Sequence, residues 1–362
     1  MFPEGNRVIV SAVNEHDERA KAAVDLERGA ADADAVEAVT EDSATSADPA
    51  ALAADPVEAV AENPAAQTGK RTRQEPEVVE RTLFDGSVTP MQLYRPKGAP
   101  KAIVVFFPGF GMGARYYWPM AQELCDRGYG VLVSELHGQG EQTAKPTRRN
   151  QWGYNELASN DFPEAVATAR AEFETSGECL PVYLMCHSMS GQIGSLYLAR
   201  PEADVDGMIT VGSGTPHHIR FTGEERRRLR WGGPVMWTVS RLLGYWPAGP
   251  WDLAGYGRQS GRHVREWAMF ARDGRLRPTT ADMDYGREMP KVTTPVLMLT
   301  CDGDRDCTPE SAKDLASHLP KAARFEFLDH RLGHNRWARE PEAVADRFER
   351  WLDELASGQP WP

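Results

Sequence analysis

The chain has 362 residues, of which 41% are hydrophobic, and a formal net charge of −12 at pH 7. This length allows one large domain or two ordinary ones, and the hydrophobic share is sufficient for a sizeable core. Residues 1–75 hold 16 acidic and 7 basic side chains, so −9 of the net charge lies in them. An acidic chain without a basic tract on its body is not expected to bind nucleic acid.

Membrane-spanning and secreted proteins are also not expected. The sequence contains no run of 18 apolar residues, and residues 1–13 lack the basic and apolar regions of a signal peptide. The five cysteines lie in or beside apolar runs, which suggests buried thiols in a reducing compartment. These features predict a cytoplasmic protein.

The N-terminal segment differs in composition from the rest of the chain. Residues 15–67 consist mainly of Ala, Asp, Glu, Val and Pro and include no aromatic residue. Such a segment has no broad apolar face to bury, so residues 1–75 are predicted to form a disordered, acidic, Ala-rich tail. It would serve as a solvated linker or bind a partner.

From residue 78 onward, strands and helices alternate. Residues 78–84 and 88–94 predict a hairpin around Asp85-Gly86, and the apolar run 102–107 is typical of a buried strand. Further strands are predicted at 129–134, 182–186, 205–211, 295–300 and 324–328, and helices at 116–126, 155–173, 193–200, 310–319 and 342–355. This order predicts an α/β fold, a mostly parallel sheet with helices on both faces. The sheet would be divided between residues 76–212 and 290–357 by an insertion at 213–289.

Ser188 follows the buried-strand pattern of residues 182–186 and precedes the predicted helix at 193–200. A serine on a tight strand-to-helix turn is the nucleophile elbow of Gly-x-Ser-x-Gly type, which needs small residues two positions before and two after it. Those positions hold Cys186 and Ser190. The alternative interpretation is a serine that caps an ordinary helix.

A serine nucleophile needs a base to take its proton and a carboxylate to orient that base. The strand at 295–300 leads into three candidate acids, of which Asp304 is favoured, Asp306 is the second choice and Asp302 the third. The strand at 324–328 leads to His334, which follows a glycine and is favoured over His330. Ser, Asp and His therefore occur in the order that this kind of site requires.

The same chemistry needs two backbone N–H groups that stabilise an oxyanion. One is expected from Met189, the residue after the nucleophile, and the other from Phe110 in the loop after the strand at 102–107. The glycine-rich stretch 137–140 follows the wrong strand for this role and is interpreted as a structural turn.

These motifs together resemble a known family. PGFG (108–111), HGQG (137–140), CHSMSGQ (186–192), DGDRD (302–306) and GH (333–334) are similar to motifs of α/β-hydrolases of the serine aminopeptidase/monoacylglycerol-lipase-like, lysophospholipase-type group. The resemblance covers residues 78–357 and implies an α/β-hydrolase fold with a helical cap over the serine at 213–289. The chain departs from the family at Pro108-Gly109, where His-Gly is usual, and at both elbow glycines.

The insertion holds half of the chain's ten tryptophans. Trp231, Trp237 and Trp246, together with His217, are predicted to line a pocket for an acyl chain, although these tryptophans would equally serve to pack the cap onto the core. The neighbouring arginines 226–228 suggest a third interpretation, peripheral contact with a lipid surface. The adjacent pair His217-His218 has no zinc-site spacing, and no metal or cofactor is expected.

The sequence thus predicts a serine hydrolase that cleaves the carboxylic ester of a lipid or another apolar acyl group. A peptidase, an amidase or an acyltransferase would use the same triad of Ser188, Asp304 and His334. The rival from another class is a non-catalytic binding protein of the same fold, whose tail recruits partners.

Overall fold

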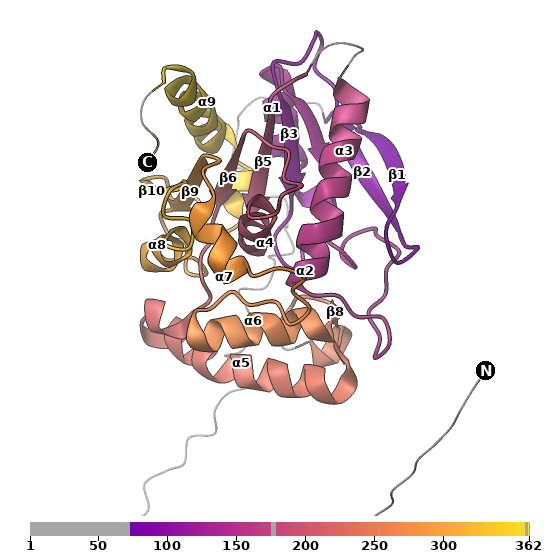
Figure 1. The fold of residues 1–362 in the computed structure, drawn as a ribbon, viewed down its shortest axis with the longest axis vertical. Helices are drawn as coiled ribbons and strands as arrows, with labels where there is room; N and C mark the ends of the chain where they lie inside the picture. The colour runs from indigo at the N-terminus through magenta and orange to yellow at the C-terminus, as the bar shows by residue number, and fades with distance from the viewer. Residues whose placement is uncertain (1–72, 175–178, 253, 359–360, 362) are drawn as a thin grey trace, which may run out of the picture. The chain divides into compact units, whose positions relative to one another are not determined.

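The computed structural model describes residues 73–174, 179–252, 254–358 and 361. Its main feature is an eight-stranded sheet with the order β1-β2-β4-β3-β5-β6-β9-β10 (Figure 1). The strands are β1 (Glu77–Thr82), β2 (Val88–Tyr94), β3 (Ile103–Phe107), β4 (Gly130–Val133), β5 (Val182–His187), β6 (Gly207–Val211), β9 (Val296–Cys301) and β10 (Ala323–Leu328). Strand β2 pairs antiparallel with both β1 and β4, and the six strands β4, β3, β5, β6, β9 and β10 run parallel.

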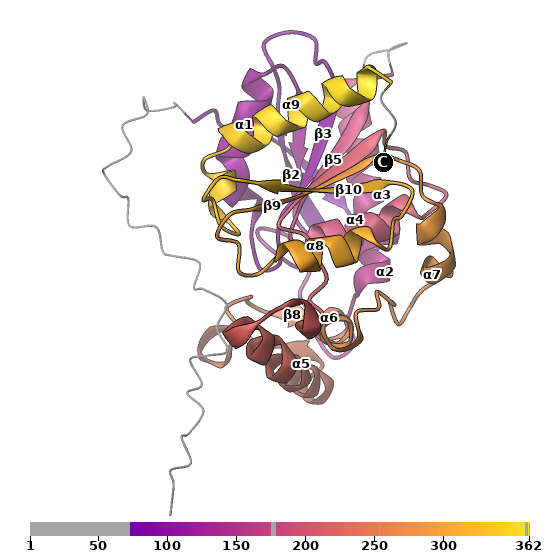
Figure 2. The same ribbon diagram turned by 90° about the vertical axis from the view of Figure 1, so that its left-hand side faces the viewer.

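The central strands are apolar on both faces because helices cover both faces. Every residue of β3, β4, β6 and β9 is buried, whereas the edge strand β1 alternates exposed and half-buried side chains. The main covering helices are α1 (Trp118–Asp126), α3 (Phe162–Phe173), α4 (Met189–Leu198), α8 (Pro309–Ala316) and α9 (Glu342–Ala356). Helices α1 and α9 lie on one face of the sheet, and α3, α4 and α8 lie on the other (Figure 2). The predicted mostly parallel sheet with helices on both faces is confirmed.

Two helices differ most clearly from their predicted bounds. The segment predicted as one helix at 155–173 consists of α2 (Tyr154–Glu156), a wider π-helical turn (Leu157–Asp161) and α3. Helix α4 begins at Met189, four residues before the predicted start, because the backbone turns sharply at Ser188. The stretch 189–191, which contains Ser and Gly, has the composition of a loop, but it lies in the first turn of this helix.

The insertion at 213–289 contains two long helices and a short hairpin. They are α5 (Gly223–Leu243), β7 (Tyr245–Trp246), β8 (Gln259–Ser260) and α6 (Gly261–Asp273), followed by α7 (Tyr285–Glu288). Short 3-10 turns occur at Ala114–Tyr117, His218–Arg220, Gly249–Trp251, Met289–Lys291 and Arg336–Ala338. Helices α5 and α6 lie side by side below the sheet in both views (Figures 1 and 2) and share a small core of Met236, Trp246, Ala254 and Val264.

The parallel register brings the carboxyl ends of the strands to one edge. Phe107 of β3 pairs with Cys186 of β5, and His187 pairs with Val211 of β6. The loops that follow β3, β5, β6, β9 and β10 therefore converge, and ligand sites of parallel sheets form at such an edge. The tail predicted for residues 1–75 falls almost wholly on residues 1–72, which lie outside the described residues.

Candidate active site

Ser188 occupies the turn between β5 and α4. Its φ of 55° and ψ of −120° make it the only non-glycine residue with positive φ in the described part of the chain. Its N–H donates to the carbonyl of Val211 at 3.0 Å, which ties the turn to the neighbouring strand β6. A non-glycine residue with this backbone conformation is strained by about 1–3 kcal/mol, and such strain persists where the surrounding structure imposes it.

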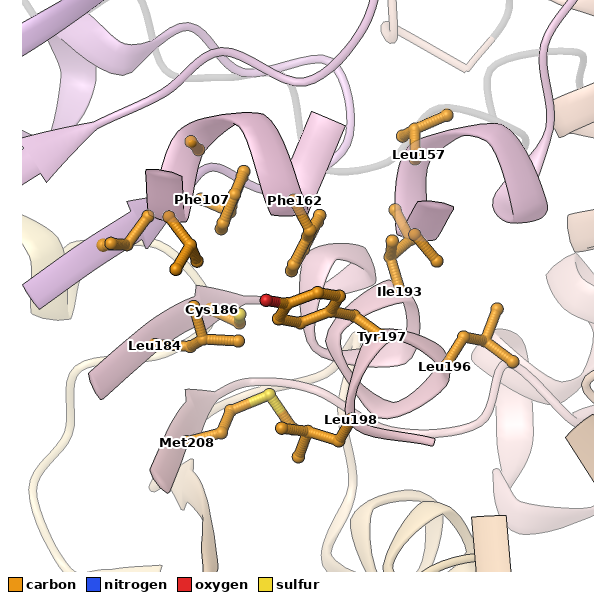
Figure 3. Close-up of a cluster of buried hydrophobic side chains, with 14 of the residues drawn as sticks. Phe107, Leu157, Phe162, Leu184, Cys186, Ile193, Leu196, Tyr197, Leu198 and Met208 are labelled. Carbon is orange, nitrogen blue, oxygen red and sulfur yellow. The ribbon is translucent and has the colours of Figure 1, made fainter. Parts of the chain in front are cut away.

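The two small residues of the elbow each have a structural partner. The Ser190 hydroxyl lies 2.9 Å from the carbonyl of Phe107 and 2.8 Å from that of His187, so it can donate to the end of either strand. Cys186 packs among Leu184 and Tyr197 (Figure 3), and a Cβ placed on Gly194 of α4 would lie 3.3 Å from its Sγ. A thiol therefore fits at this position because α4 carries a glycine opposite it.

His334 and Asp304 lie beside Ser188. The Nε2 atom of His334 is 3.0 Å from Ser188 Oγ, and its Nδ1 atom is 3.0 Å from both carboxylate oxygens of Asp304. Because a carboxylate can only accept, Nδ1 carries the proton and Nε2 of the neutral ring can accept from the serine hydroxyl. Gly212 passes so close that a Cβ there would lie 3.0 Å from His334 Nδ1.

The three candidate acids have different surroundings. Asp304 Oδ1 also accepts the N–H groups of Asp306 at 3.0 Å and Cys307 at 2.8 Å, which hold the carboxylate in place. The Asp306 side chain forms an ion pair with Arg228 of α5, and the Asp302 carbonyl accepts the N–H of Gly333. Asp304 alone among the three contacts His334, and the second histidine candidate, His330, is exposed.

The charges around His334 favour its protonated form. Burial lowers the pKa of His334, but the attraction of Asp304, the hydrogen bond to it and the charge of Asp306 outweigh burial and raise the pKa to about 9. Burial raises the pKa of Asp306, whereas the charges of His334 and Arg228 lower it, and the net result is a pKa below the usual value of 3.8. Asp306 is therefore ionised and paired next to the imidazole.

The loop at residues 108–113, named here the oxyanion loop, faces Ser188 from β3. The N–H of Gly109 donates to the Tyr117 hydroxyl, and the N–H of Gly111 donates to the Gln139 side chain. Phe110 lies between these two anchored residues and contributes to the wall of the cavity at Ser188. Met189 is the first residue of α4, so its N–H has no carbonyl one turn earlier in the helix to bind.

A cavity of about 150 Å³ lies between this edge of the sheet and the insertion. Ser188, Met189 and His334 line it from the sheet side. The insertion contributes mainly apolar side chains, namely Phe221, Leu229, Val235, Met236, Trp246, Tyr256 and Trp267, and the charged residue Arg228. In the described part of the chain, no group of three or more His, Cys, Asp or Glu side chains is arranged to hold a metal ion.

Comparisons with known proteins agree with this architecture. A family model described as serine aminopeptidase, S33, matches residues 98–250. A soluble variant of monoglyceride lipase from Saccharomyces cerevisiae is similar over 79% of this chain and 98% of its own, with 14% identity and a TM-score of 0.56. An α/β-hydrolase from Penicillium sp. sh18 is similar over 78% and 98%, with 18% identity and a TM-score of 0.54. An esterase from Exiguobacterium antarcticum is similar over 76% and 100%, with 18% identity and a TM-score of 0.52.

The chain has an α/β-hydrolase fold, and part of it matches the serine aminopeptidase family model. No curated protein matches it. The fold of an α/β-hydrolase places a serine at the end of a central strand, with an acid and a histidine on later loops. In this chain, Ser188 follows β5, Asp304 follows β9 and His334 follows β10, and the three side chains lie in contact.

Of the four predicted pocket residues, Trp246 lies in the wall of this cavity, and the other three lie outside it. Trp231 is 64% exposed and Trp237 is 39% exposed, because the buried face of α5 is formed by Leu229, Gly232, Gly233, Met236 and Ser240 at helical spacing. His217 lies against Gly274 and 4.0 Å from Asp314, away from the cavity. Trp246 is buried in the cavity wall, where its Nε1–H donates to Asp252.

Several residues around the candidate site were not predicted from the sequence. Tyr117, His187 and Trp337 bind backbone groups of the site, and Gln139 of the HGQG turn binds the oxyanion loop. The position of His187 directly before the nucleophile was the one available signal for these contacts. The partners of Tyr117 and Gln139 lie on other loops, so no local pattern indicates them.

Proposed function

We propose that this protein of α/β-hydrolase fold is a serine hydrolase that cleaves carboxylic esters through an acyl-enzyme. The observation that carries the proposal is the continuous contact from Ser188 Oγ to His334 Nε2, and from His334 Nδ1 to Asp304, beside an apolar cavity. Ser188 would attack the ester carbonyl while His334 takes its proton, and Asp304 would keep the imidazole in the reactive tautomer.

The negative charge formed in this step would fall on the former carbonyl oxygen. We assign its stabilisation to the N–H groups of Met189 and Phe110, since both residues border the cavity next to Ser188. His334 would then give the proton to the departing alcohol, and a water molecule activated by the same histidine would release the acid. Loss of one oxyanion donor costs about 10²–10³-fold in kcat in comparable enzymes.

The apolar wall of the cavity favours an apolar acyl group. Leu229, Met236 and Trp246 are buried in that wall, whereas Arg228 and Asp306 lie on its charged side. We therefore propose a monoacylglycerol-lipase-like or esterase-like activity. In this interpretation residues 213–289 form a cap on the catalytic domain, which is composed of residues 76–212 and 290–357.

The outer side of α5 also supports peripheral contact with a lipid surface. Its exposed side chains include Trp231 and Leu242, each 64% exposed, and the arginines Arg226, Arg227, Arg230 and Arg241. Trp251, which follows in the short turn Gly249–Trp251, is 77% exposed. Aromatic side chains next to arginines suit an interface with anionic headgroups. None of the helices in the described ranges is of the length and apolarity that crossing a bilayer requires.

Hydrolysis of p-nitrophenyl esters of increasing acyl length tests the proposed activity. The protein should release p-nitrophenol, and Ser188→Ala should abolish this release. Matched p-nitroanilides separate esterase from amidase activity, and added alcohols reveal acyl transfer as new ester products. Absence of turnover of every ester by the wild-type protein would refute the proposal.

A further inference from the structure

A buried chain of hydrogen bonds runs behind Ser188 from the oxyanion loop to the base. The N–H of Gly109 is 2.9 Å from the Tyr117 hydroxyl, which is 2.6 Å from His187 Nδ1. The other ring nitrogen of His187, Nε2, is 2.9 Å from the backbone carbonyl of His334. The side chains of Tyr117 and His187 are fully buried.

The direction of each bond follows from the chemistry of its ends. The His334 carbonyl can only accept, so His187 Nε2 carries a proton. The Gly109 N–H can only donate, so the Tyr117 oxygen accepts from it and its own proton is free to point at His187 Nδ1. The Met112 sulfur, 3.1 Å from the Tyr117 hydroxyl, is a much weaker acceptor than an imidazole nitrogen.

His187 is neutral in this arrangement. Its pKa is held well below the ordinary value of 6.5 by burial and by the nearby charge of His334, although the hydrogen bond to the His334 carbonyl acts in the opposite direction. A protonated His187 would also turn Nδ1 into a donor and leave the Tyr117 hydroxyl proton without this acceptor. The hydrogen bonds from Gly109 to the His334 carbonyl are thus consistent with a single set of proton positions.

The same contacts fix the distances between the parts of the site. His187 packs so closely on Gly109 that a Cβ there would lie 2.7 Å from His187 Nδ1. The His334 carbonyl accepts a second bond, at 3.0 Å, from Trp337 Nε1, whose ring packs on that of His187. One cluster therefore holds the backbone on both sides of Ser188.

We propose that Tyr117 and His187 are positioning residues, which hold the oxyanion loop and the backbone of His334 in register around Ser188. This role rests on the proposed ester hydrolysis. Oxyanion donors are effective only when they lie within a few tenths of an ångström of their working distance from the developing charge. Loss of the Tyr117 hydroxyl releases Gly109, and with it the neighbouring Phe110 N–H, from that position.

The test compares two tyrosines that play the same backbone-binding role in different places. Tyr117→Phe removes a buried hydroxyl that accepts the Gly109 N–H, and Tyr197→Phe removes a buried hydroxyl that accepts the Asp204 N–H at the far end of α4. Both variants should lower the melting temperature. Tyr117→Phe should in addition reduce kcat about 10- to 100-fold while KM changes less than about threefold, and Tyr197→Phe should change neither.

The affinity for a boronic acid inhibitor is a second measure of how well the oxyanion donors are positioned. An alkylboronic acid accepts Ser188 Oγ on boron and becomes a tetrahedral anion, with the serine proton taken by His334. Its affinity should fall in Tyr117→Phe by about the same factor as kcat/KM, because both depend on the oxyanion donors. Equal kcat values for the wild type and Tyr117→Phe, or equal losses in the two tyrosine variants, would overturn the positioning role.

Nitrogen NMR of isotope-labelled histidine tests the network without any turnover. At pH 7 His187 should be in the neutral tautomer protonated at Nε2, and a ring protonated at Nδ1 would overturn the inference. If the wild-type protein hydrolyses no ester, the proposed function fails and the positioning role falls with it. If the wild type is active and only the Tyr117 result is negative, the positioning role alone fails.

Discussion

Asp306 is paired with Arg228, although it lies only two residues beyond the carboxylate that contacts His334. The pair joins α5 of the insertion to the loop that carries Asp304. A second ion pair, between Glu225 of α5 and Arg305, lies next to it on the same loop. In the loop after β9, Asp304 thus contacts His334, whereas Arg305 and Asp306 form ion pairs with α5 of the insertion.

This division of roles predicts different effects for two similar substitutions. Asp304→Asn should reduce kcat by about 10³–10⁴-fold, because an amide no longer enforces the reactive tautomer of His334. Asp306→Asn should cost much less, since the contact between Asp304 and His334 is unchanged. Steady-state kinetics on one p-nitrophenyl ester measures both, and a reversed order would make Asp306 the functional acid.

The pH dependence of activity should follow the raised pKa of His334. His334 must be neutral to accept the serine proton, so kcat/KM should rise with pH until about pH 9, the pKa that Asp304 and Asp306 impose against the effect of burial. Asp306→Asn removes a negative charge that favours the imidazolium, so the rising limb should move to lower pH. Asp302→Asn is the control, and an equal shift in that variant would contradict this explanation.

Folding stability should depend on the same group. The pKa of His334 is about 9 in the folded protein against an ordinary 6.5, so the folded state binds its proton more tightly. The resulting stabilisation is complete below pH 6.5 and is lost as the pH rises through 9. Urea unfolding of the wild type and His334→Ala across this range should give curves that converge at high pH, and parallel curves would refute the linkage.

Ser190 and Ser195 provide a test of the elbow. Both are buried in α4, but the Ser190 hydroxyl binds the carbonyls at the ends of β3 and β5, whereas Ser195 binds only Gly191 of its own helix. Ser190→Ala should destabilise the protein by about 0.5–1.5 kcal/mol, and Ser195→Ala should have almost no effect. Equal free energies of unfolding for the two variants would show that the hydrogen bond from Ser190 to β3 does not contribute to stability.

Two adjacent residues of α5 test which face meets the substrate. Met236 is buried in the cavity wall, and Trp237 points outward. Met236→Ala should raise the ratio of kcat/KM for an octanoate over a butyrate ester by about tenfold or more, since each methylene accommodated in a pocket is worth roughly 1–3 kcal/mol. Trp237→Ala should leave the ratio unchanged. A larger shift in Trp237→Ala than in Met236→Ala would show that the face of α5 with Trp237 meets the substrate.

The sequence predicted those parts of the site that rest on local pattern and chain order. The apolar runs of β3, β5 and β9 and the order of Ser188, Asp304 and His334 required only strand periodicity and the spacing of polar residues after each strand. The orientation of α5 was not predictable in this way, because Trp231 and Trp237 lie on its exposed face. Tyr117 and His187 meet across 70 residues of sequence, and only the folded sheet brings them together.

Labelling with a fluorophosphonate tests the central claim most directly, because the probe reacts only with an activated nucleophile and requires no knowledge of the substrate. Mass spectrometry of the digested protein should find the phosphonyl group on Ser188, and labelling should disappear in Ser188→Ala and slow greatly in His334→Ala. An unlabelled wild-type protein, or a probe attached to another residue, would contradict the assignment of Ser188 as the nucleophile.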